Sequence, residues 1–343
     1  MKLSVHIPTY RRPEAINNCL QAISTQCTGA VEEILIAVDD ANDAFNSSSI
    51  DIPEAIAKIT RTLQFPKVGL ITLRQEMLAQ AQGDIVLWLN DDAYPETGFF
   101  EHHLEIHRQH NDCVVGGRSQ WKPIQSPNLF DRLVQQSDLI FFEPPATTTP
   151  TQINYRNCFG LNMSFPRELA IKLGGIPSIP NTYGYDDIEL AYRFEQASIP
   201  IFHQPLAIVT HDHRYSPTDV LRREYLLGQS ALSFARQNPD FAQALFKRDI
   251  TSRSELNYAQ ELLPRQYRDA SRIEKTFISL EEQPYNTISS ANLHLLTEHW
   301  ILLKRYLWNW GLLDAANQQS SRWQLLQSTS AEAIGSHAIN ASR

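Results

Sequence analysis

Hydrophobic residues in the first hundred positions form short apolar runs separated by segments with helical spacing. Residues 34–38 and 85–89 are unbroken runs rich in β-branched residues, and residues 3–7 begin a similar pattern, as is typical of buried strands. Apolar positions recur at helical spacing after Pro13 and again over residues 70–81. Strands that alternate with helices through short connections predict a largely parallel sheet covered by helices.

The same pattern continues, less regularly, along the rest of the chain. Gly83 is expected to cap the helix that ends near residue 81. Ser216-Pro217-Thr218-Asp219 has the residues of a capping box with proline at the first helical position, and helical spacing follows it. Further elements are expected at 96–110 (helix), 113–117 and 139–142 (strands), 166–175 (a short helix closed by Gly174-Gly175), 186–198 (helix) and 207–210 (strand). The sequence therefore predicts an α/β fold, a mostly parallel twisted sheet between helices over residues 1–235, followed by a helical C-terminal extension over 236–343.

Composition and charge narrow the class of protein. The 343 residues are 42% hydrophobic and 20% charged, as in ordinary globular proteins. The net charge of -8 argues against nucleic acid as the main partner. No apolar stretch reaches the roughly 18 residues that a membrane span needs, and the first residues do not have the pattern of a signal peptide. The four cysteines show no zinc or redox spacing, so we expect reduced thiols in a cytoplasmic protein.

Four clusters of acidic residues or histidines each follow a predicted strand or open a predicted helix. They are Asp39-Asp40, Asn90-Asp91-Asp92, Asp186-Asp187 and His211-Asp212-His213. Taken singly, each could cap a turn, complement a helix dipole or lie on the surface. Ligands of open α/β sheets bind at the carboxyl ends of the strands, and adjacent carboxylates there repel each other unless a cation neutralises them. Together the clusters predict a divalent metal and a phosphate-bearing substrate.

These clusters, in this order, resemble those of family 2 glycosyltransferases, which have the GT-A fold. The segments that carry the resemblance are 5–12, 38–40, 83–92, 162–164 with Gly174-Gly175, and 184–190. The last segment also resembles the acceptor-side motif of the β-galactosyltransferase branch. The resemblance covers about residues 1–235, with a nucleotide-sugar half at 1–117 and an acceptor half at 118–235.

The resemblance implies a role for each matching position. The nucleotide-sugar would contact Pro8, Thr9, Tyr10, Arg11, Asp39, Asp40, Arg74, Asn90 and Asp91. Asp92 would bind the metal together with His211 or, alternatively, His213, and Asp187 would be the catalytic base. The acceptor would contact Tyr183, Gly184, Tyr185 and Asp186. Asn90 stands at the first position of the Asp-x-Asp motif and brings no charge, so Arg74 or Arg118 could share the charge of the diphosphate.

The implied activity is metal-dependent transfer of a sugar, with inversion, from a nucleoside diphosphate donor to a hydroxyl group. A UDP-sugar is the favoured donor, and the acceptor is a glycan, a lipid-linked sugar or a small molecule, as in polysaccharide biosynthesis. Oxygen ligands with an imidazole suit manganese or magnesium, and manganese tolerates the nitrogen better.

Two other classes of function compete with this interpretation. A non-catalytic nucleotide- or sugar-binding protein of the same fold would lack the base, but Asp187 is present. A metal-dependent nucleotidyltransferase or phosphohydrolase would need a glycine-rich phosphate loop, which the sequence does not contain. The helical tail, with residues 296–313 near helical spacing, either packs on the catalytic domain or a second copy in a homodimer, or contacts a membrane surface.

Overall fold

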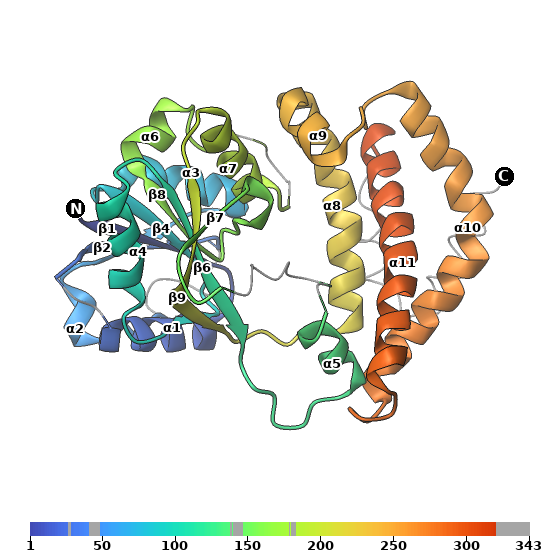
Figure 1. Cartoon of the computed structure of the whole chain (residues 1–343), viewed down its shortest axis with the longest axis horizontal. Helices are drawn as coiled ribbons and strands as arrows, with labels where there is room; N and C mark the ends of the chain where they lie inside the picture. The colour runs from blue at the N-terminus through green and yellow to red at the C-terminus, as the bar shows by residue number, and fades with distance from the viewer. Residues whose placement is uncertain are drawn as a thin grey trace. The chain divides into compact units, whose positions relative to one another are not determined.

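The computed structural model describes residues 1–26, 29–40, 49–137, 139, 147–177, 179 and 183–319 (Figure 1). The strands are β1 (Leu3–Thr9), β2 (Val31–Val38), β3 (Thr60–Gln64), β4 (Ile85–Leu89), β5 (Ala93–Pro95), β6 (Val114–Trp121), β7 (Thr151–Ile153), β8 (Asn162–Pro166) and β9 (Ile201–His211). The helices are α1 (Pro13–Gln26), α2 (Glu54–Ala57), α3 (Leu70–Gln80), α4 (Phe99–Gln109), α5 (Leu129–Gln135), α6 (Arg167–Lys172), α7 (Asp186–Gln196), α8 (Pro217–Gln237), α9 (Pro239–Phe246), α10 (Arg253–Ser279) and α11 (Ser290–Ala316), with short 3₁₀ turns at Tyr155–Asn157 and Leu280–Glu282. The strand expected at 139–142 lies almost entirely outside the described residues.

The described strands form one mixed sheet in the order β3-β2-β1-β4-β8-β6-β9-β5, with β7 paired to β9. The parallel pairing expected for the first part is confirmed, since β1 is parallel to β2 and β4, and β2 is parallel to β3. Beyond β4 the sheet is not mostly parallel, because β8 runs antiparallel to both β4 and β6, and β5 runs antiparallel to β9.

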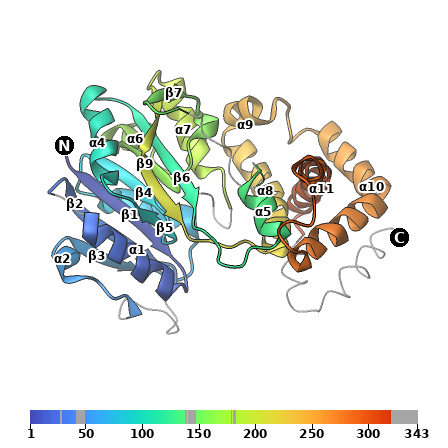
Figure 2. The same ribbon diagram turned by 60° about the horizontal axis from the view of Figure 1, so that its bottom comes forward.

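Helices cover both faces of this sheet (Figure 2). On one face, Arg74 of α3 lies over the ring of Trp88 in β4, and Phe194 of α7 contacts Phe165 in β8. On the opposite face, His103 of α4 lies 2.8 Å from the hydroxyl of Ser164, whose side chain alternates with that of Phe165 along β8. The sheet is therefore buried on both sides, which explains the apolar run of β4.

Gly83 has a different role from the one predicted. Helix α3 ends at Gln80 with Ala81 as its C-cap, and Gly83 does not have the positive φ of a helix-ending glycine. A Cβ at residue 83 would lie 2.6 Å from the backbone nitrogen of Ser4. The glycine thus allows the chain to pass close to β1 on its way into β4.

The described chain divides into two compact units. The first comprises Met1–Pro123, Phe142–Asn181 and Asp186–His213, and contains the sheet. The second comprises Ile124–Phe141, Thr182–Tyr185 and Arg214–Arg343, and its described elements are helical. None of the described helices combines the length and the hydropathy that a membrane span needs.

The second unit is built around the contact between α8 and α11, which lie side by side (Figures 1 and 2). The capping box predicted at Ser216 starts α8, with Asp219 as its reciprocal partner. Two glycines let the helices approach closely, because a Cβ at Gly228 would lie 2.0 Å from the carbonyl oxygen of Trp308, and one at Gly311 would meet the backbone of α8 at the same distance.

Candidate active site

Two buried carboxylates follow β4, at the edge of the sheet where the sequence predicts a ligand. Asp91 and Asp92 are 1% and 3% exposed. Burial raises the pKa of Asp91 to about 6, although the charge of Arg12 opposes the shift. Burial would also raise the pKa of Asp92, but hydrogen bonds with His211 and His213 outweigh it and hold that pKa well below its usual range. Asp92 is therefore the firmly ionised member of the pair.

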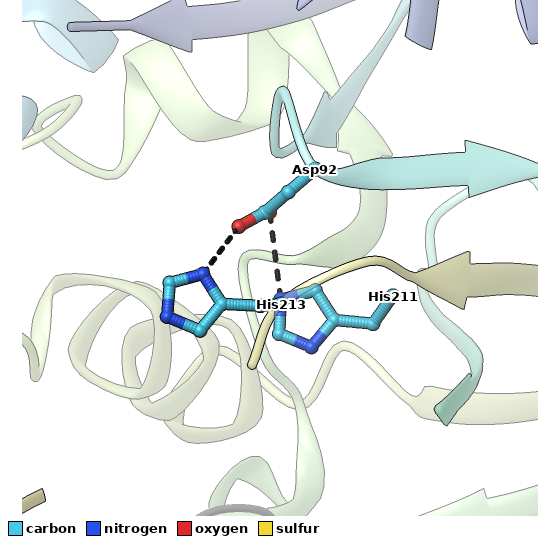
Figure 3. Close-up of side chains that lie close together, drawn as sticks. All are labelled: Asp92, His211 and His213. Carbon is cyan, nitrogen blue, oxygen red and sulfur yellow. Dashed lines mark hydrogen bonds and ion pairs between the residues drawn. The ribbon is translucent and has the colours of Figure 1, made fainter. Parts of the chain in front are cut away.

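Both predicted histidines meet Asp92 (Figure 3). His211 Nε2 lies 3.4 Å from Asp92 Oδ1, and His213 Nδ1 lies 3.2 Å from Asp92 Oδ2. The antiparallel pairing of β5 with β9 places Ala93 opposite His211, so the sheet register brings Asp92 to this histidine. The two imidazole rings stack with centroids 5.7 Å apart, because side chains two residues apart on an extended chain point to the same side.

Arg12, for which the sequence pattern predicts no role, also contacts both carboxylates. Its guanidinium donates from Nε and Nη2 to Asp91 and from Nη1 to Asp92 Oδ2, at 2.7 Å. The same Nη1 lies 3.5 Å from His213 Nδ1. The sequence does show Arg12 as a second basic residue directly after Arg11, in the loop that follows β1. This pair of arginines was the signal from which a contact with the acids could have been predicted.

Of the other predicted residues at the end of β1, Thr9 and Arg11 contact neighbouring acids and Tyr10 contacts a lysine. The hydroxyl of Thr9 donates to Asp91 Oδ2 at 2.8 Å, which adds to the network around the carboxylates. Arg11 forms an ion pair with the buried carboxylate of Asp40. Tyr10 is 37% exposed, and the cation of Lys67 lies 4.9 Å from the centre of its ring.

Asp39 receives hydrogen bonds from the loop that precedes α3. Its carboxylate accepts the backbone N–H of Val68 at 2.6 Å and that of Gly69 at 3.0 Å. Burial raises the pKa of Asp39, and these two N–H groups oppose the shift. Two further predicted contacts, Pro8 inside β1 and Asn90 directly after β4, are only partly buried.

Arg74 and Asp186 form a buried ion pair on the α3 face of the sheet. Arg74 is 3% exposed and donates from Nη1 to Asp186 Oδ2 at 2.6 Å and from Nη2 to the carbonyl oxygen of Gly160 at 3.0 Å. Its guanidinium also lies 4.2 Å from the centre of the Trp88 ring. The structure thus places Arg74, a predicted contact of the nucleotide-sugar, beside the predicted base, whereas Arg118 is exposed on β6.

Asp187 lies in the first turn of α7, next to this ion pair. Its carboxylate accepts the backbone N–H of Gly160 and that of Ile188, each at 2.8 Å. Desolvation raises the pKa of Asp187, and the neighbouring Asp186 carboxylate adds to the rise, while Arg74 and the two N–H groups oppose it. A carboxylate with a raised pKa is a stronger proton acceptor than an ordinary aspartate, as a general base requires.

The three residues before Asp186 belong to the second unit. The ring of Tyr185 packs against Phe234 and Phe246, and its hydroxyl accepts the indole N–H of Trp308 at 3.0 Å. Tyr185 and Gly184 both have positive φ values, of 68° and 72°. Tyr183 is 42% exposed, so it is the predicted acceptor residue with the more accessible ring.

Asp92, His211 and His213 have the composition and spacing of a metal site. Each offers one ligand atom, and the three atoms lie within 4.8 Å of one another. Asp92 Oδ1 is buried, and its contact with His211 Nε2 at 3.4 Å is longer and less well aligned than an ordinary hydrogen bond. One carboxylate with two imidazoles suits divalent transition metals better than magnesium or calcium, which prefer oxygen ligands. The residues present therefore fit a divalent cation.

Comparison with known proteins identifies a family for about half of the chain. Residues 4–171 match the family described as "Glycosyl transferase family 2". A glucosyl-dolichyl phosphate glucuronosyltransferase from Haloferax volcanii is 27% identical over 183 residues, which cover 51% of this chain and 56% of the relative. The uncharacterized glycosyltransferase YfnE from Bacillus subtilis is 27% identical over 130 residues, covering 37% of this chain and 32% of that protein. The chain thus matches about half or less of each of these curated relatives.

Solved structures share the fold over nearly the whole chain. Residues 1–349 of S. aureus TarS, in complex with UDP-GlcNAc, align with a TM-score of 0.52 at 15% identity, covering 94% of this chain and 93% of that one. The mannosyltransferase PcManGT from Pyrobaculum calidifontis, in complex with GDP-Man and Mn²⁺, aligns with a TM-score of 0.55 at 17% identity, covering 93% and 88%. The fold is therefore GT-A, as the sequence predicts, and residues 4–171 of this chain belong to glycosyltransferase family 2.

Proposed function

We propose that this chain is a metal-dependent, inverting glycosyltransferase that moves a sugar from a nucleoside diphosphate donor to an acceptor hydroxyl. The observation that carries the proposal is the cluster of Asp92, His211 and His213 at the carboxyl end of β4. A divalent cation bound there would stabilise the negative charge that develops on the leaving diphosphate. Manganese fits two imidazole ligands better than magnesium does.

Asp187 is proposed as the general base. Its carboxylate takes the proton of the acceptor hydroxyl while the oxygen forms a bond to the anomeric carbon. The bond between that carbon and the diphosphate oxygen breaks, and the nucleoside diphosphate leaves with the electron pair. Attack from the face opposite the leaving group inverts the anomeric carbon. Gly160 and Ile188 hold the base through their backbone N–H groups.

The donor and the acceptor are proposed by class. The nucleotide is expected to contact the loop after β1 and the carboxylates of Asp39 and Asp40, and we favour a UDP-sugar. The two structural neighbours were crystallised with different nucleotide sugars, so both UDP and GDP belong in the first screen. The name of the Haloferax relative supports a lipid-linked sugar among the possible acceptors, besides a glycan or a small molecule.

Calorimetric titration with UDP, GDP and dTDP, each with Mn²⁺ and with a chelator, tests the proposed donor site. We expect one nucleotide to bind, and only with the metal. If Asp92→Ala retains the metal dependence of the wild-type protein, the metal site lies elsewhere. If no nucleotide binds to the folded protein, the proposed function is wrong.

Asp187→Asn tests the base separately. This variant should retain nucleotide binding and lose about 10²- to 10⁴-fold in transfer rate, because it removes general-base catalysis alone. Transfer is measured as release of the nucleoside diphosphate with the donor identified above. Wild-type activity in Asp187→Asn would exclude Asp187 as the base.

A further inference from the structure

Arg12 stands at the point where the proposed ligands of the cation converge. Its Nη1 lies 2.7 Å from Asp92 Oδ2 and 3.5 Å from His213 Nδ1. Its remaining donors contact Asp91. From this geometry we propose that the Arg12 guanidinium is an exchangeable counter-ion, which competes with the divalent cation for the carboxylates and moves to the diphosphate when the nucleotide binds. This inference rests on the proposed function.

The charges explain why a counter-ion is needed. Asp91 and Asp92 are adjacent and almost completely buried, so their negative charges repel each other in a region with little water. The guanidinium is planar and can bridge both carboxylates, which the single point charge of a lysine would do less well. Arg12 therefore keeps the two acids together as long as no cation neutralises them.

The exposure of Arg12 explains why it can leave. Its side chain is 39% exposed, whereas the carboxylates that it contacts are 1% and 5% exposed. Arg12 directly precedes α1, and its carbonyl oxygen accepts the N–H of Ile16 at 3.1 Å, so α1 holds its backbone while its side chain reaches solvent. The guanidinium can move toward solvent while the carboxylates stay where the sheet places them.

This arrangement couples the binding of the cation to the binding of the nucleotide. A cation that binds alone must displace Arg12 from Asp92, which costs the guanidinium one of its two carboxylate partners. A nucleoside diphosphate offers new acceptors, since arginine binds phosphate oxygens in the same bidentate way as carboxylates. The nucleotide should therefore raise the affinity for the metal, and the metal should raise the affinity for the nucleotide by the same factor.

The inference is tested by measuring Mn²⁺ binding in the presence and in the absence of UDP or GDP. The concentration of free Mn²⁺ is followed through its paramagnetic resonance signal. Arg12→Gln should bind Mn²⁺ alone about tenfold or more tightly than the wild-type protein, because the hydrogen bonds to charged partners no longer have to be broken. The gain in affinity on adding nucleotide should be smaller in this variant than in the wild type. The Mn²⁺ affinity of Arg12→Lys should lie between those of the wild type and Arg12→Gln. If Arg12→Gln does not fold, Arg12→Lys takes its place in the experiment.

Arg61→Gln is the matched control. Arg61 is 41% exposed and pairs with the buried Glu33, so it is an arginine of similar exposure on a buried carboxylate at another place in the sheet. This variant loses the same charge and should bind Mn²⁺ as the wild type does.

The outcomes separate the inference from the proposed function. If the wild type binds Mn²⁺ with nucleotide but Arg12→Gln binds Mn²⁺ alone no more tightly, the inference is wrong and the metal site stands. Equal tightening in Arg61→Gln would also overturn the inference, because the effect would then be a general one of net charge. If no protein binds Mn²⁺ under either condition, both the inference and the metal-dependent function are wrong.

Discussion

Removing one partner of the buried pair Arg74–Asp186 is expected to lower stability strongly and to change the protonation of the proposed base. Arg74→Met would leave the carboxylate of Asp186, which is 1% exposed, without the cation that now lies 2.6 Å away. Removing one partner of a buried ion pair costs about 3–5 kcal/mol, because the other charge stays buried and uncompensated. We expect the free energy of unfolding of Arg74→Met to fall by this amount.

Urea denaturation of single and double variants measures this effect. Arg74→Met with Asp186→Leu should recover most of the lost stability, because replacing both charges by apolar groups removes the uncompensated charge. Arg108→Met is a control, since Arg108 and its partner Glu101 are 53% and 44% exposed and such pairs contribute at most about 1 kcal/mol. The reasoning fails if Arg74→Met costs no more than Arg108→Met, or if the double variant is less stable than Arg74→Met.

The same substitution should change the pH dependence of transfer. Arg74 opposes the rise in the pKa of Asp187 that desolvation and Asp186 cause. Without Arg74 this pKa rises further, so the base becomes ionised only at higher pH. The acid limb of kcat/KM against pH should therefore move to higher pH in Arg74→Met. An unmoved limb would show that Arg74 does not control the protonation of the base.

Two further predictions concern the cores of the two units. Gly228→Ala should lower the free energy of unfolding by about 1–3 kcal/mol, because its Cβ would lie 2.0 Å from the carbonyl oxygen of Trp308. Gly29→Ala is the control and should leave the free energy of unfolding unchanged, because a Cβ there has no neighbouring heavy atom within 4 Å. Burial lowers the pKa of His103 to about 4 and that of His107 to about 3. Above pH 6.5 both histidines are neutral in the folded and the unfolded protein, so their burial costs no proton binding. As the pH falls toward 4, the unfolded protein binds protons that the folded protein does not, and the free energy of unfolding decreases. Urea midpoints that stay constant between pH 7 and 4.5 would contradict the second prediction.

The sequence predicted the elements whose pattern is local. The apolar run of β4 is found at Ile85–Leu89 as expected, and the capping box at Ser216 starts α8. Gly174 and Gly175 close α6 with positive φ values of 99° and 67°. In each of these places the physical cause lies within a few residues along the chain, either as burial of one run or as satisfaction of the first N–H groups of a helix.

Apart from the histidines beside Asp92, which the family resemblance implied, the sequence did not predict contacts between residues far apart in the chain. The antiparallel pairing of β8 with β4 brings Phe165 opposite Val86, a pairing between strands about eighty residues apart that no local pattern indicates. Arg12 reaches Asp92 because β1 and β4 are neighbours in the sheet, and no local pattern indicates that contact. For Gly83 the local pattern suggested a cap, but a close approach to β1 requires the glycine instead.

Each of the two acid pairs of the first unit places two adjacent carboxylates close together, and their charges repel each other. The arginines that compensate these charges differ in exposure. Asp186 beside Asp187 is compensated by Arg74, which is 3% exposed and also bonded to a backbone carbonyl. Asp91 beside Asp92 is compensated by Arg12, whose side chain is 39% exposed. A charge needed in every step of a reaction is best held by a buried partner, whereas a site that must accept a cation needs a partner that can leave. The exposure of the arginine thus supports a permanent role for the first pair in holding the base and an exchangeable role for the second in binding the metal.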